Sequence, residues 1–62
     1  MNLLKIDAAE AKTGLHRATI FRMEADGRFP IRRQVGLRAV RWLEREIDQW
    51  MEGLPLAGRA TA

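Results

Sequence analysis

The chain lacks several residue types on which small folds and enzymes often depend. Its 62 residues contain no cysteine, serine or tyrosine, and the one histidine is His16. Without cysteine, neither a disulfide nor a cysteine-based zinc site can stabilise the fold. The Ser–His and Cys–His pairs of nucleophilic catalysis are excluded, and one histidine cannot form a two-histidine metal face. These absences predict a binding module without metal or cofactor, and not an enzyme.

Long hydrophobic runs are also absent. Only Leu3 and Leu4 form an apolar pair before Lys5, which is far shorter than the core of a signal peptide. No stretch approaches the roughly 20 apolar residues of a membrane-spanning helix. We therefore expect a soluble, cytoplasmic protein with no membrane partner, and the absence of cysteine suits a reducing compartment.

The charge is small in total but unevenly distributed. Eleven basic and eight acidic residues give a net charge of +3. Residues 1–42 hold nine basic and four acidic groups, a balance of +5, whereas residues 43–62 have a balance of −2. Five arginines and no acid lie between Gly27 and Leu43. Because arginine binds phosphate and guanine through paired hydrogen bonds, this asymmetry indicates nucleic acid; the alternative is a solvated basic surface.

The first helix is predicted over residues 7–12. Asp7 is a favourable N-cap residue, and Glu10 stands three positions later, so the two predict a capping box. Gly14 can adopt the left-handed conformation that ends a helix. The alanines in this segment have little bulk, which lets another helix approach closely.

A second helix is predicted over residues 16–25 and ends at a turn. The three residues 13–15 separate the two helices, which is the spacing of a helix-turn-helix. At about 100° per residue, Ile20 and Met23 fall on the inward side. The opposite side contains two arginines, an alanine and a phenylalanine: Arg17, Ala18, Phe21 and Arg22. A phenylalanine between two arginines favours a nucleic-acid-reading face; packing against the following segment is the alternative for Phe21.

A β-hairpin is predicted over residues 31–42. Pro30 excludes a continuing helix, and apolar and polar residues alternate on both sides of Gly36. Val40 and Trp42 lie two positions apart and form the expected packing face. Four polar side chains are then expected to point outward: Arg32, Gln34, Arg38 and Arg41. Arg41 has a second possibility, an ion pair with an acid of the following segment.

The third helix is predicted over residues 43–52, before Gly53 and Pro55. Its apolar residues form one stripe: Leu43, Ile47, Trp50, Met51 and Leu54. Its acidic residues are expected to form a solvated face, with a protein-contact surface as the alternative. Trp42 and Trp50 are expected in the core, because a domain this small needs large aromatic side chains to fill its interior.

Several segments together resemble the AlpA family of phage and prophage regulators. TGLHRATIFR at residues 13–22 is similar to the family's TGLSRSTIYR stretch. GRFP at residues 27–30, VRW at 40–42 and EIDQW at 46–50 follow in the family's order. The chain departs from the family at His16, where serine is common, and at Glu10, where a small apolar residue is favoured.

The resemblance implies a mainly α fold with a small β-hairpin, a winged helix-turn-helix similar to MerR-type regulators and small excisionases. Residues 1–54 are then the DNA-binding domain and residues 55–62 a flexible tail. The second helix is expected to enter the major groove, and the hairpin to contact the flanking backbone or minor groove. The candidate DNA contacts lie on these two segments: His16, Arg17, Ala18, Thr19, Phe21, Arg22, Arg28, Arg32, Arg33, Gln34 and Arg38.

Different roles are expected within this set. Arg17 and Arg22 are candidates for paired hydrogen bonds to guanine. Three hairpin arginines are candidates for phosphate contacts, or alternatively for an edge charge that prevents strand aggregation: Arg32, Arg33 and Arg38. His16 is expected to cap the second helix or to contact a phosphate.

Three functions are compatible with these expectations. The first is a transcriptional regulator that binds specific double-stranded DNA, with RNA polymerase as a protein partner. The second is an excisionase that bends attachment-site DNA for an integrase. The third is an interaction module or inhibitor that uses the basic face on an acidic protein. On DNA we expect a monomer or cooperative assembly on adjacent sites.

Overall fold

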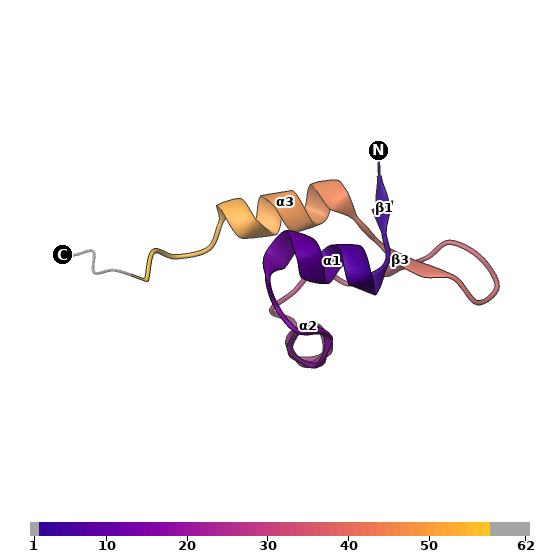
Figure 1. Ribbon diagram of the computed structural model, residues 1–62, viewed down its shortest axis with the longest axis horizontal. Helices are drawn as coiled ribbons and strands as arrows, with labels where there is room; N and C mark the ends of the chain where they lie inside the picture. Colours follow the sequence, from indigo (N-terminus) through magenta and orange to yellow (C-terminus); the bar gives the residue numbers. More distant parts are fainter. Residues whose placement is uncertain (1, 58–62) are drawn as a thin grey trace.

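The computed structural model describes residues 2–57, which form three helices and a small antiparallel sheet (Figure 1). The elements follow in the order β1 (Leu3–Leu4), α1 (Ile6–Thr13), α2 (Arg17–Ala25), β2 (Arg33–Gln34), β3 (Val40–Leu43) and α3 (Glu44–Glu52). In Figure 1, α1 and α3 lie across the view and α2 is seen nearly end-on, so α2 crosses both at a steep angle. This confirms the predicted mainly α fold with a hairpin. No helix within residues 2–57 is both long and apolar enough to cross a membrane.

The start of α1 differs from the prediction. The helix is preceded by Lys5 in an extended conformation, and no side chain caps it. Leu4 pairs with Trp42 in the sheet, and Ile6 packs against the core, so the helix begins at Ile6. Asp7 therefore lies in the first turn, where its charge favours the helix dipole. The predicted capping box of Asp7 and Glu10 is wrong, because tertiary packing sets this helix start.

The ends of α1 and α2 confirm the turn signals. Gly14 has φ 77° and donates its N–H to the carbonyl oxygen of Glu10 at 2.7 Å. Gly27 also has φ 77° and follows Asp26, the C-cap residue of α2. A side chain in this left-handed region is strained, so glycine is favoured at both positions.

The sheet contains a strand that the sequence patterns did not reveal. The strand order is β1-β3-β2, and both pairs are antiparallel. On one side of β3, Leu3 lies opposite Leu43. On the other side, Arg33 lies opposite Arg41 and Gln34 opposite Val40. The predicted hairpin is confirmed, but its strands are shorter than expected.

We call residues 31–42 the wing. Residues 31–38 are all exposed, and the loop between β2 and β3 projects away from the helices (Figure 1). Val35 donates its N–H to the carbonyl oxygen of Ala39 at 2.8 Å. The Gln34 side chain donates to the carbonyl oxygens of Gly36 and Leu37 at 2.6 and 3.2 Å. Gln34 therefore holds the tip of the wing instead of pointing freely outward.

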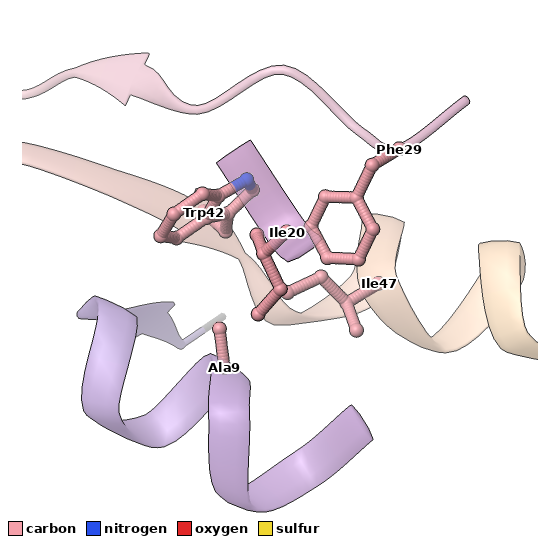
Figure 2. Packing of buried hydrophobic residues seen from close by; sticks show 5 residues of the cluster. All are labelled: Ala9, Ile20, Phe29, Trp42 and Ile47. Atoms are coloured by element: carbon pink, nitrogen blue, oxygen red, sulfur yellow. The ribbon is translucent and has the colours of Figure 1, made fainter. Parts of the chain in front are cut away.

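The core lies where α1, α2 and α3 meet β3. Five buried side chains converge there (Figure 2): Ala9, Ile20, Phe29, Trp42 and Ile47. The Trp42 indole is 1% exposed and donates its N–H to the carbonyl oxygen of Pro30 at 2.9 Å. Burying the indole is favourable because its polar group has a partner. Val40, the other half of the predicted packing face, is 38% exposed and lies outside this core.

Trp50 was predicted to lie in the core. It is half-buried and packs at the margin of the core. Its ring meets Phe29 edge-on, with ring centres 4.7 Å apart. Its indole N–H donates to the carbonyl oxygen of Arg28 at 2.8 Å. Trp50 thereby fastens the segment between α2 and the wing to α3.

The acidic helix α3 is not the solvated face that the sequence predicts. Lys12 of α1 forms ion pairs with Glu44 and Asp48 at 2.9 and 2.8 Å. Arg33 of the wing forms an ion pair with Glu46. Three acids of α3 therefore bind basic residues of the body and the wing, because packing brings opposite charges together across elements.

The chain after α3 has no regular structure within the described residues. Gly53 ends the helix, and residues 54–57 form neither helix nor strand. Leu54 is 48% exposed, so the predicted apolar stripe of α3 ends at Met51. Residues 58–62 of the predicted tail lie outside the described residues.

Candidate nucleic-acid interface

The N-terminus of α2 is capped by two side chains. The His16 Nδ1 accepts the N–H of Ala18 at 3.1 Å, which confirms the predicted capping role of His16. A carboxylate oxygen of Glu10 accepts the N–H of Arg17 at 2.7 Å. Two of the helix's unpaired N–H groups are thus satisfied, one of them from the preceding helix. Glu10 caps α2, not α1.

The Arg17 side chain is turned toward α1. Its guanidinium lies 2.7 Å from a carboxylate oxygen of Asp7 and 3.1 Å from one of Glu10. The hydrogen bond with Arg17 holds the pKa of Glu10 below its usual value, and the bond with Glu10 raises the pKa of Arg17. Arg17 therefore joins the two helices of the helix-turn-helix.

Arg22 differs from Arg17 although both lie on α2. Its side chain is exposed and has no ion pair or hydrogen bond with any residue in the described range 2–57. Ala18, one turn earlier, is exposed as well and leaves the backbone accessible. Thr19 is half-buried, at the side of the helix. The exposed part of α2 therefore presents one unpaired guanidinium beside a small side chain.

Phe21 packs against the wing, which was one of its two predicted alternatives. Its ring stacks on Trp42 with ring centres 6.3 Å apart and an angle of 27° between planes. The guanidinium of Arg32 lies 4.9 Å from the centre of the Phe21 ring, a cation–π arrangement. Phe21 remains 37% exposed, so part of its ring is accessible between α2 and the wing.

The base of the wing is anchored by two ion pairs. Glu24 of α2 is only 8% exposed. One oxygen of its carboxylate accepts the backbone N–H of Arg32 at 2.8 Å, and the other lies 3.3 Å from the Arg32 Nε. Arg33 is paired with Glu46 of α3. Arg32 is exposed, as predicted, but it is not free, because its guanidinium and backbone N–H pair with the buried carboxylate of Glu24.

The remaining candidates of the wing region have different surroundings. Arg28 is exposed and forms an ion pair with Asp26 at 3.3 Å. Arg38, near the tip, is exposed and has no ion pair within residues 2–57. Arg41 donates to the carbonyl oxygen of Val40 at 2.8 Å and does not form the ion pair with α3 that was one of its alternatives.

A cleft of about 740 Å³ lies beside these contacts, between the exposed parts of α2 and the wing. Phe21 and Ala25 of α2 line one side, and Ile31 and Val40 of the wing line the other. Arg32 and Gln34 also reach this cleft, so the structure brings three predicted site residues together here: Phe21, Arg32 and Gln34. Arg17 and Arg28 have partners elsewhere and do not line it.

A helix-turn-helix with an exposed second helix, followed by a projecting hairpin and a third helix, defines a winged helix-turn-helix. The family model described as "Prophage CP4-57 regulatory protein (AlpA)" matches residues 2–54. The chain belongs to the AlpA family.

Two relatives support this assignment. The chain is 37% identical over 57 residues to the "DNA-binding transcriptional activator AlpA" of Escherichia coli K12, covering 82% of this chain and 81% of the relative. It is 41% identical over 46 residues to the "Uncharacterized protein ORF88" of Enterobacteria phage P4, covering 74% of this chain and 51% of that protein. The chain thus spans about half of the phage protein. No solved structure matches the chain.

Proposed function

We propose that the chain is a sequence-specific DNA-binding transcriptional regulator of prophage type. The observation that carries this proposal is the exposed face of α2, where Arg22 has no partner within residues 2–57 and adjoins the small Ala18. An unpaired arginine on an exposed helix is suited to bidentate contact with guanine in the major groove. The name of the Escherichia coli relative supports DNA as the ligand and transcription as the process.

The proposed mechanism is binding without catalysis, and different arginines have different roles in it. Arg22 contacts a base edge and Arg38 contacts a phosphate beside it. Arg32 and Arg33 hold the wing at a fixed angle to α2 through their ion pairs with Glu24 and Glu46. Phosphate contacts fix position, whereas base contacts determine sequence preference.

The experiment first selects preferred duplexes from a random library with the unaltered chain. Affinities for a selected and an unrelated duplex are then measured for Arg22→Ala, Arg38→Ala and the control Arg45→Ala. Arg45 is exposed on α3 and its side chain has no partner within residues 2–57. Arg22→Ala should reduce discrimination by about 1–3 kcal/mol, and Arg38→Ala should weaken both duplexes alike. Equal, small effects of all three substitutions would contradict the proposal.

A DNA-bending factor of excisionase type is the second candidate, and Leu37 favours it. This side chain at the tip of the wing is 95% exposed. Apolar side chains that enter the minor groove unstack base steps and bend the duplex. Under this function an integrase would be the partner, whereas a regulator would act on RNA polymerase.

The bend angle of a selected duplex distinguishes the two candidates. Energy transfer between dyes on the DNA ends measures it with the unaltered chain and with Leu37→Ser. A bend that shrinks in Leu37→Ser supports the bending factor. A straight duplex in both complexes contradicts the bending factor and favours a regulator that acts by binding alone.

A further inference from the structure

A second cleft, of about 250 Å³, lies where the wing meets α2 and the start of α1. Its apolar lining includes Phe21 and Val40, which are 37% and 38% exposed. Its lining holds four basic side chains and no acidic one: Lys5, Arg32, Arg38 and Arg41. These residues come from three separate parts of the chain, so no local pattern in the sequence reveals them as a group.

The two clefts differ in their charge. The larger one contains Glu24, which balances Arg32. In the smaller one, Lys5, Arg38 and Arg41 have no ion pair with any described residue between positions 2 and 57. Gathering like charges is unfavourable unless an anion joins them.

The acids nearest to this cleft along α1 are already engaged. Asp7 and Glu10 both bind Arg17. Neither carboxylate lines the cleft. The ion pairs described above therefore leave the cations of the cleft uncompensated.

We propose that this cleft binds one phosphate group of the DNA backbone. Lys5, Arg38 and Arg41 supply the positive charge, and the two partly exposed apolar side chains accommodate the adjoining deoxyribose. The proposal rests on the proposed function and extends it, because it adds Lys5 and Arg41 to the interface. One DNA strand then passes between the wing and the N-terminal half of α2.

Salt dependence tests the proposal. Affinity for a labelled duplex of random sequence is measured at several salt concentrations for the unaltered chain, Lys5→Gln, Arg41→Gln and the control Arg45→Gln. Each lost phosphate contact should reduce the slope of log affinity against log salt by about 0.9. Because three cations share the phosphate, we expect a decrease of up to this size for Lys5→Gln and Arg41→Gln. The slope should be unchanged for Arg45→Gln, which removes the same charge outside the cleft.

Slopes of the two cleft variants that equal the slope of Arg45→Gln would overturn the proposal while leaving DNA binding intact. Circular dichroism checks that the variants are folded; if Arg41→Gln is not, the exposed Lys5→Gln decides. If the unaltered chain binds no duplex, the proposed function fails, and titration with inorganic pyrophosphate tests the cleft alone. Amide shifts in β3 that vanish in Lys5→Gln then support a phosphate site, and the absence of shifts excludes it.

Discussion

The centre of the domain and the wing use the same residue types in opposite surroundings. Ile20 at the centre is fully buried, whereas Ile31 of the wing is 60% exposed. The centre is held by buried side chains from all three helices and by Trp42 at the end of the wing (Figure 2). The rest of the wing is held by ion pairs at its base and by hydrogen bonds near its tip. The projecting part of the wing therefore lies outside the packed core.

The arginines of the wing repeat this contrast on a smaller scale. Arg32 and Arg33, at the base, are bound to carboxylates of α2 and α3. Arg38, near the tip, has no ion pair within residues 2–57. A run of arginines that looks uniform in the sequence therefore contains two residues paired with carboxylates and one, Arg38, without such a partner among residues 2–57.

Matched isoleucine substitutions give the largest expected difference between the two regions. Ile20→Ala should reduce the free energy of unfolding by about 2–5 kcal/mol, because it removes a buried side chain and leaves a cavity. Ile31→Ala should change it by no more than about 0.5 kcal/mol. Urea unfolding followed by circular dichroism measures both. Equal losses would show that the wing and the centre unfold as one packed unit.

Removing Glu24 tests the connection between the regions and should have an intermediate effect. Glu24→Ala leaves the Arg32 N–H and guanidinium without their buried partner, which should cost about 1–3 kcal/mol. Glu52→Ala, an exposed substitution on α3, is the control and should change stability little. Hydrogen exchange in β2 should also accelerate in Glu24→Ala. Unchanged exchange there would mean that the wing does not depend on this ion pair.

Acid should have the smallest effect, and it acts on the helical body. Arg17 holds the pKa of Glu10 below its usual 4.5, and Lys12 does the same for Glu44. A carboxylate with a lowered pKa in the folded state contributes stability above pH 4.5, and loses it as the pH falls through the lowered value. The melting temperature should therefore decrease below this pH.

The double variant Glu10→Gln, Glu44→Gln is the control for this acid effect. Its melting temperature should change less between about pH 3 and about pH 6 than that of the unaltered chain. The effect is small because both carboxylates are near solvent, where ion pairs are weak. Parallel curves for the two proteins would assign the acid sensitivity to other groups.

Local signals account for the parts of the fold that the sequence predicts. Gly14 and Gly27 mark helix ends because their backbone conformation is decided within a few residues. The inward direction of Ile20 and the cap by His16 follow from helix geometry. The family resemblance, which rests on ordered segments, is confirmed by the match over residues 2–54.

Contacts between distant residues account for what the sequence did not predict. Glu10 was expected to cap its own helix but binds Arg17 of the next one. Arg32 was expected to have no partner, but it pairs with Glu24, eight positions earlier. Lys5 and Arg41, which line the smaller cleft, were not among the candidates either, since only the fold brings them together. Such pairs between different elements do not follow the regular spacing of a helix or a strand, so they cannot be predicted from the sequence pattern.

The pairing of β1 with β3 has a consequence for the order of folding. Leu3 and Leu43 are forty positions apart, and closing so long a loop costs conformational entropy before any contact forms. β3 is also the central strand, so β1 and β2 have no sheet partner until it is present. We therefore expect the sheet to form after the local contacts of the helix-turn-helix.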